Sequence, residues 1–244
     1  MTLVFDRLTR EPAYQKISKA IEDKILSRAL APGDALPSET ALAEQFGVNR
    51  ATVREGLRQL EMAGLVERRP GSKKFAVATP RAADVAAGVS RALKLNEVTF
   101  AEVWEAMMVV EPACARLAAT RASESDVASL REIVDGLHTD DADLDGAVEQ
   151  VVRFFQRLAE LAGNRALKMT EAPLATLLRP SLRLVLGRVL QARTRIKDAQ
   201  LKILDACAAH DAEAAERWMT KHIVDFRRGY EIAGIALDKV IPLG

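Results

Sequence analysis

Two short segments near the N-terminus, residues 37–43 and 48–57, constrain this chain most. Their sequence predicts a short helix, a glycine turn and a second helix. Asn49 has the side chain of a good N-cap for that second helix. Arg50 and Arg54 lie four residues apart and project from one face. This arrangement is typical of a helix whose first turn enters the DNA major groove, although a surface helix with two solvated arginines has the same pattern.

The residues on either side favour the DNA-binding interpretation. Two strand-like runs, 65–68 and 74–77, are separated by a turn rich in Gly, Pro and cations at 69–73. Three helices followed by a basic hairpin predict a winged helix-turn-helix domain, whose hairpin reaches the DNA backbone or the adjacent groove. The first helix is indicated by apolar residues at helical spacing: Tyr14, Ile17, Ala20, Ile21 and Ile25.

Residues 10–78 resemble the DNA-binding domain of the GntR family of bacterial transcription regulators. Tyr14 and the segments 32–39, 49–57 and 64–66 carry the resemblance, in the same order and at the same spacing. It implies DNA contacts from the start of the second motif helix and from the wing, where Gly71 lies. Thr40 occupies a position where some relatives place another contacting side chain. Lys73 stands where the family wing usually has a second glycine, and a lysine there can contact phosphate. The implied contacts in the helix are Asn49, Arg50, Thr52 and Arg54.

Composition predicts a cytoplasmic protein without a membrane span or signal peptide. The chain has 244 residues and a net charge of +1, enough length for two domains. Residues 1–80 contain 13 Lys or Arg and 10 Asp or Glu residues, a small positive excess where DNA would bind. Cys114 and Cys207 lie far apart in alanine-rich helical segments, and we expect two reduced, buried thiols.

The rest of the chain predicts only helices, so the fold class is mainly α. We expect a winged helix-turn-helix domain at 1–78, a linker at 79–84 and an all-α effector-binding and dimerisation domain at 85–244. This second domain resembles the FCD ligand-sensing domain of FadR-type GntR regulators, through residues 102–112, 117–119, 154–164 and 210–222. The helices are expected near 84–95, 99–121, 124–138, 143–162, 164–171, 173–197, 198–209 and 211–235.

Three of the four positions of a metal site that many FCD relatives have are changed in this chain. By motif alignment, the aspartate is replaced by Val151 and two of the three histidines by Phe155 and Gln200, which leaves His222. A single imidazole with two apolar side chains and an amide does not make a transition-metal site. The sequence therefore predicts no bound metal.

The same positions predict an apolar effector pocket. Relatives often carry an arginine that binds a ligand carboxylate where this chain has Met107. With Val151 and Phe155, this residue favours a larger apolar effector, such as an acyl chain or an aromatic molecule. Gln200 and His222 would supply its polar contacts. The alternative is that these side chains have closed the pocket into ordinary core.

Six cations and no acid occur between Glu171 and Asp198. On one continuous helix, Arg183, Arg193 and Lys197 fall on one face. They form either a solvated face or a strip that binds phosphate, and the second option would suit an acyl-coenzyme A effector.

Together these patterns predict a ligand-responsive, sequence-specific DNA-binding regulator. We expect a homodimer that binds an operator, and most simply a repressor that a small metabolite releases. The alternatives are a DNA-binding protein with a non-functional pocket and a metal-dependent sensor of small organic acids. The sequence contains no nucleophile–base motif, glycine-rich phosphate loop or paired catalytic carboxylates, so we do not expect an enzyme.

Overall fold

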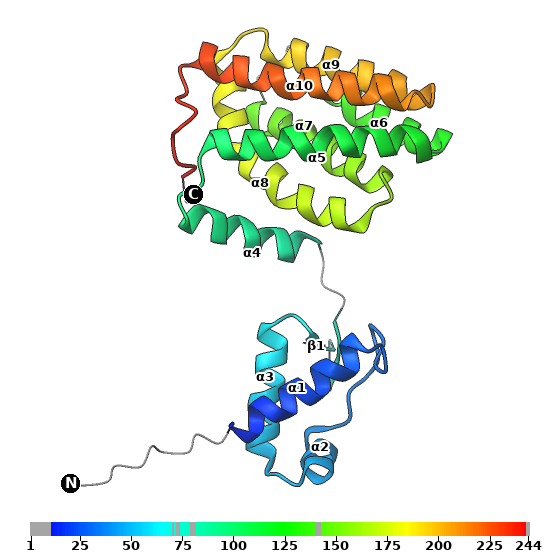
Figure 1. Ribbon diagram of the computed structural model, residues 1–244, viewed down its shortest axis with the longest axis vertical. Helices are drawn as coiled ribbons and strands as arrows, with labels where there is room; N and C mark the ends of the chain where they lie inside the picture. The colour runs from blue at the N-terminus through cyan, green and yellow to red at the C-terminus, as the bar shows by residue number, and fades with distance from the viewer. Residues whose placement is uncertain (1–10, 70, 72–73, 79–81, 140–142, 243–244) are drawn as a thin grey trace, which may run out of the picture. The chain divides into compact units, whose positions relative to one another are not determined.

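The computed structural model describes residues 11–69, 71, 74–78, 82–139 and 143–242. The chain divides into two compact units, residues 1–81 and 82–244, and this division falls within the segment 79–84 predicted as a linker. Figure 1 shows each unit with its own set of packed elements. The mainly α fold is confirmed, and none of the described helices is long and apolar enough to cross a membrane.

The described residues of the first unit form three helices and a two-stranded antiparallel sheet. Ser38 caps the second helix by accepting a hydrogen bond from the Ala41 amide, and Gly47 ends it in the left-handed conformation. The strands pair with Val66 opposite Val77 and Arg68 opposite Phe75. The elements are α1 (Ala13–Leu26), α2 (Glu39–Phe46), α3 (Arg50–Met62), β1 (Val66–Arg68) and β2 (Phe75–Val77).

A close crossing of α1 and α3 holds the first unit together. Gly56 of α3 lies against α1, where an added Cβ would be 3.0 Å from the Tyr14 carbonyl oxygen and 3.2 Å from Ile17 Cγ2. The Ser18 hydroxyl donates to the Gly56 carbonyl over 2.9 Å. Glycine therefore sets the distance between the helix that is expected to read DNA and its main support.

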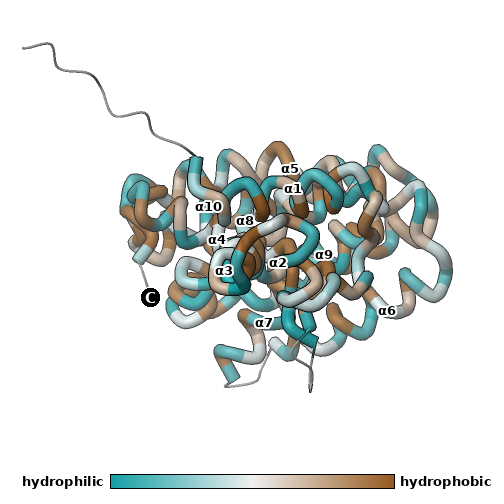
Figure 2. Tube along the Cα trace, turned by 90° about the horizontal axis from the view of Figure 1, so that it is seen from below, coloured by the Kyte–Doolittle hydropathy of each residue, from teal (hydrophilic) through white to brown (hydrophobic). Residues whose placement is uncertain are grey.

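The second unit is a bundle of helices. Figure 1 shows α5 running beside α10, while α4 lies at the edge of the unit, where it packs on α8. Hydrophobic and hydrophilic residues alternate along the helices in Figure 2, as expected where each helix buries one face. The helices are α4 (Ala82–Leu95), α5 (Phe100–Arg121), α6 (Glu124–Asp135), α7 (Leu144–Leu161), α8 (Arg165–Arg188), α9 (Ala192–Ala208) and α10 (Ala212–Ala233).

The course of α8 differs from the sequence prediction. We expected a break before Pro173 and a helix continuing to residue 197, whereas α8 passes through both Pro173 and Pro180 and ends at Arg188. Each proline removes one helical hydrogen bond, but the buried face of α8 packs against α7 and α5 and keeps the helix continuous. The predicted helix at 198–209 correspondingly begins earlier, at Ala192.

Both cysteines are buried and neither forms a disulfide, as predicted. Burial raises the pKa of the Cys114 thiol to about 12 and that of the Cys207 thiol to about 11. Both are therefore protonated core side chains at neutral pH.

Replacing Gly56 with alanine should destabilise the first unit, because the new methyl group forces α1 and α3 apart. We expect a loss of about 1–3 kcal/mol, as for other overpacked helix contacts. Calorimetric unfolding of the full chain measures it. Gly88→Ala is the control: that helical position has open space around it, and alanine there should be neutral or slightly stabilising. An unchanged transition in Gly56→Ala would contradict the close-packing argument.

Candidate nucleic-acid interface and ligand cavity

The start of α3 is organised by its N-cap. The Asn49 side-chain oxygen accepts from the Thr52 amide at 2.8 Å and from the Thr52 hydroxyl at 3.0 Å. Arg50 and Arg54 are both exposed, while Val53 and Leu57 on an adjacent face are buried in the unit. The helix therefore presents its two first arginines to solvent and keeps its apolar stripe inside, as the sequence predicts.

An acidic residue of α2 holds one of these arginines. The Arg54 guanidinium donates through Nη2 to Glu39 Oε2 at 2.9 Å and through Nε to the same oxygen at 3.2 Å. This hydrogen bond lowers the pKa of Glu39, and the charges of Arg54, Arg50 and Arg68 lower it further. The contact fixes a long, 60% exposed side chain in one direction. Sequence analysis did not select Glu39, because nothing local shows that α2 and α3 bring the two residues together.

The wing adds cations to the same unit. The Arg68 guanidinium lies 4.6 Å from the centre of the Phe75 ring, and Arg69 donates to the Gly33 carbonyl at 2.6 Å. Gly71 has φ of +73°, a conformation suited to glycine. Thr40 is exposed next to Glu39. Lys73, the other predicted wing contact, lies outside the described residues.

The five residues predicted for an effector pocket are all buried in the second unit. Met107, Val151 and Phe155 belong to its main apolar core. The Phe155 ring stacks on the His222 imidazole, with centroids 5.7 Å apart and planes 11° apart, and Phe226 lies 4.9 Å from the imidazole on a tilt. Met107, Val151 and Phe155 are therefore packed core residues. This corresponds to the alternative in which the predicted pocket at these positions is closed.

The two polar members of that set are Gln200 and His222. Both amide atoms of Gln200 and the Nε2 atom of His222 are buried, and among the described residues they have no hydrogen-bond partner. Burial lowers the pKa of His222 to about 4, against the opposing effect of the Asp225 carboxylate. The imidazole is therefore neutral at physiological pH.

The predicted cationic strip is wrong, because its three residues lie on two helices. Arg183 is on α8 and forms an ion pair with Asp145 at the start of α7. Arg193 and Lys197 are on α9, since α8 ends before them. Lys197 donates to the Leu137 carbonyl at 3.0 Å, just beyond the end of α6, and Arg193 donates to the His138 carbonyl at 3.4 Å.

A cavity of about 290 Å³ lies where the end of α8, the start of α9 and the middle of α10 meet. His222 forms part of its wall, so one predicted effector residue does reach an open space. The cationic groups on the cavity are Arg188, Arg195 and Arg228, and the acid is Asp225. The apolar lining residues are Val185, Val189, Leu190, Ala192, Ile196, Phe226 and Ile232.

We call this cavity the α8–α10 cavity, and two of its arginines have defined partners. Arg195 forms a two-pronged contact with Asp225, with Nε donating to Oδ2 at 2.9 Å. Arg188 donates to the Ala233 carbonyl at 2.9 Å. Leu190 is 97% exposed and Ile232 58% exposed, so apolar surface continues outside the cavity. An apolar lining with excess positive charge is suited to an amphipathic anion.

Sequence analysis had singled out the acid-poor stretch that contains Arg188 and Arg195, but it selected other arginines there. Asp225 and Arg228 carried no local signal. Among the described residues, no group of three or more His, Cys, Asp or Glu side chains is placed to hold a metal ion. The absence of a metal in solution stays a prediction.

The buried imidazole should make stability depend on pH. The pKa of His222 is about 4 in the fold and near 6.5 in the unfolded chain, so the unfolded chain binds an additional proton between these values. The free energy of unfolding should therefore fall as pH drops from about 6.5 to about 4, by up to about 1.4 kcal/mol per pH unit.

Denaturant unfolding at several pH values, with wild type and His222→Phe compared, measures this contribution. The phenylalanine variant keeps an aromatic ring against Phe155 and should lose the His222 part of the slope. His138→Gln replaces an exposed histidine and should follow the wild type. Equal slopes for wild type and His222→Phe would refute the assignment.

Two family models match the chain: bacterial regulatory proteins of the gntR family over residues 13–75, and the FCD domain over residues 102–225. The HTH-type transcriptional regulator Mce2R of Mycobacterium tuberculosis is 30% identical over 219 residues, which cover 86% of this chain and 88% of that protein. LutR of Bacillus subtilis, also an HTH-type transcriptional regulator, is 28% identical and covers 80% of this chain and 91% of its own length.

Among solved structures, Streptococcus agalactiae GntR has a TM-score of 0.62 and 25% identity, and the match covers 88% of this chain and 99% of that one. The matched families and relatives are regulators of transcription and not enzymes. The chain therefore belongs to the GntR family of bacterial transcription regulators, with a winged helix-turn-helix domain followed by an FCD domain.

Proposed function

We propose that this protein regulates transcription by binding an operator through the start of α3, and that a small amphipathic anion in the α8–α10 cavity controls this binding. The exposed Arg50–Arg54 pair, with Arg54 held by Glu39, carries the DNA-binding part of the proposal. A guanidinium whose direction is fixed loses little entropy when it forms a fork with a guanine edge.

The remaining predictions about the assembly belong to the same proposal. We place the chain in the FadR subfamily on its pairing of domains, and propose a cytoplasmic homodimer that acts as a repressor. Operators with two half-sites match a two-fold dimer. Native mass spectrometry of protein purified without added ligand tests the dimer and detects a retained organic molecule. A monomer at micromolar concentration would refute the dimer.

Replacing Arg54 with alanine should weaken operator binding by about 10- to 100-fold, since one bidentate contact is worth about 1–3 kcal/mol. Binding is measured by fluorescence anisotropy, on a DNA sequence that wild-type protein selects from a random pool. Glu39→Gln should weaken it less, because Arg54 remains but is no longer fixed by a charge.

Arg58→Ala is the matched control for Arg54→Ala. Arg58 is also an exposed arginine of α3, one turn further along, and it pairs with Glu55 of its own helix. This variant should bind within about threefold of wild type. Equal losses in the two variants would show that general charge, and not the start of α3, determines the affinity.

The effector part of the proposal rests on the lining of the α8–α10 cavity. Its apolar wall would hold an alkyl or aromatic body, and the arginines at its edge would hold a carboxylate or phosphate. This retains the apolar or acyl-CoA-like effector that the sequence suggests, but moves its anionic contacts from Arg183 and Arg193 to Arg188 and Arg228.

Decanoate is a suitable probe, with decanol as its uncharged analogue. Decanoate should raise the melting temperature of wild type and release it from DNA, and Arg228→Glu should bind decanoate at least tenfold more weakly. Arg227→Glu is the control, because Arg227 neighbours Arg228 in sequence but packs on Trp104, with its guanidinium carbon 5.3 Å from the ring centre. No response to lipophilic anions would favour a DNA-binding protein with a closed pocket.

The metal-dependent acid sensor is a second candidate that the packing disfavours. Two of the four positions that would hold the metal, Val151 and Phe155, are fully buried apolar core residues. Elemental analysis of the purified protein should find no stoichiometric zinc, nickel or manganese, and one metal ion per chain would restore that candidate.

A further inference from the structure

A second cavity, of about 410 Å³, lies on the opposite side of α8, where α4 and α7 pack against it. We call it the α4–α8 cavity. Along α8 its lining extends from Lys168 to Arg179, which is about 16 Å at the helical rise per residue. From α4 it receives only the alanines Ala83, Ala86 and Ala87. The cavity thus has one apolar wall, which the alanines of α4 form.

The unusual group in this cavity is the carboxyl of Glu171. The residue is 1% exposed and lines the cavity, and its Oε1 atom is buried without a hydrogen-bond partner. The structure shows no ion pair or hydrogen bond to Glu171 among the described residues. A buried carboxyl without a partner costs several kcal/mol if it is ionised. Because the residue also lines a cavity, a ligand that enters beside this carboxyl would supply the missing partner.

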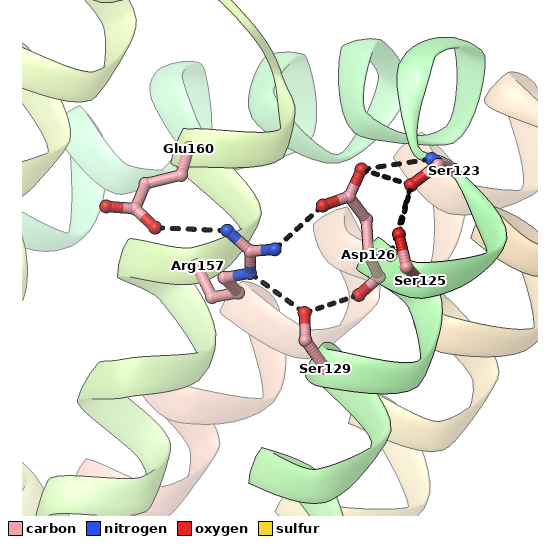
Figure 3. A network of polar contacts seen from close by, with 6 residues as sticks. All are labelled: Ser123, Ser125, Asp126, Ser129, Arg157 and Glu160. Atoms are coloured by element: carbon pink, nitrogen blue, oxygen red, sulfur yellow. Dashed lines mark hydrogen bonds and ion pairs between the residues drawn. The ribbon is translucent and has the colours of Figure 1, made fainter.

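The other charged side chains on the cavity already have partners. Lys168 is 2.7 Å from Glu160, and Arg157 also reaches Glu160, as part of the network in Figure 3 that joins α7 to the start of α6. Arg179 is 2.6 Å from Glu149. No cation of the protein is therefore left over for Glu171 on the described surface of this cavity.

A second acceptor without its helical partner belongs to a residue of this lining. Residue 180 is proline and has no amide hydrogen, so the Thr176 carbonyl cannot receive the usual helical hydrogen bond. Thr176 lines the cavity five residues beyond Glu171. A ligand that donates hydrogen bonds and carries positive charge would satisfy the carboxylate, and its aliphatic part would lie along the alanines.

We propose that the α4–α8 cavity binds a small organic cation with a primary ammonium group, which pairs with Glu171. This site is separate from the α8–α10 cavity and does not depend on the effector proposed there. Because α4 is the first helix after the DNA-binding unit in the sequence, a ligand wedged between α4 and α8 would act on the helix nearest that unit along the chain.

The surroundings of Glu171 predict that its carboxyl releases a proton when the cation binds. Desolvation, and then the charge of Glu160, raise the pKa of Glu171 to about 8. Glu111 and Cys114 face it from α5, and the pKa of Glu111 is also raised, by burial and by Glu171. Without a ligand Glu171 is therefore mostly protonated at pH 7, and pairing with an ammonium group would release close to one proton.

The experiment is calorimetric titration of the full-length protein with n-butylamine hydrochloride at pH 7.0, in phosphate and in Tris. We expect saturable binding at one site per chain. The observed binding enthalpy should differ between the two buffers by the difference in their ionisation enthalpies, multiplied by close to one proton. Butyrate should not bind. Ammonium chloride and potassium chloride should bind at least tenfold more weakly, and equal binding of these simple cations would overturn the assignment to an organic ligand.

Three variants locate the site. Glu171→Gln has the same shape without the charge and should lose binding at least tenfold, together with the proton release. Ala87→Leu should block binding by filling the cavity from an exposed position of α4. Glu132→Gln is the control, because Glu132 is an exposed glutamate of α6 outside this lining, and this variant should bind n-butylamine like wild type. Unfolding midpoints show that each variant is folded, and undiminished binding by a folded Glu171→Gln would refute the proposal.

Discussion

Stacking of Phe155, His222 and Phe226 determines where the second unit can hold a ligand. These rings fill the space between α7 and α10, with Val151 and Met107 packed in the same core. The imidazole fits there only because it is neutral, since burial keeps its pKa near 4. With the centre occupied by aromatic side chains, open space is found further out, on two sides of α8. Charged groups lie around both spaces, with arginines at the α8–α10 cavity and Glu171 at the α4–α8 cavity.

Local signals in the sequence predicted the first unit well. The N-cap at Asn49 and the turn at Gly47 act within a few residues, and they have the roles expected of them. The course of α8 could not be predicted in this way. Pro173 and Pro180 are local signals for helix breaks, but packing against α7 and α5 outweighs the two lost hydrogen bonds. Where tertiary packing competes with a local preference, the local sequence does not reveal the result.

The candidate sites show the same division. Arg50 and Arg54 could be selected because their spacing on one helix suffices, whereas Glu39 could not, because its contact with Arg54 depends on how α2 and α3 cross. Placing Arg183, Arg193 and Lys197 on one face was wrong because it required a continuous helix, whereas α8 ends at Arg188, at a point that the local sequence does not mark. Arg188, Arg195 and Asp225 meet only after α8, α9 and α10 have folded together.

The continuity of α8 has a consequence for how the second unit could process signals. One helix supplies walls to both cavities, with residues 168–179 at one and Val185, Arg188 and Val189 at the other. A helix is stiff along its axis, so a shift that opens one cavity is transmitted to the other. If each ligand moves α8, their binding free energies are linked, and each ligand must change the affinity of the other by the same factor. Pro173 and Pro180 would then lie within the helix that couples the two ligand sites, so that the response of the protein would depend on both ligands.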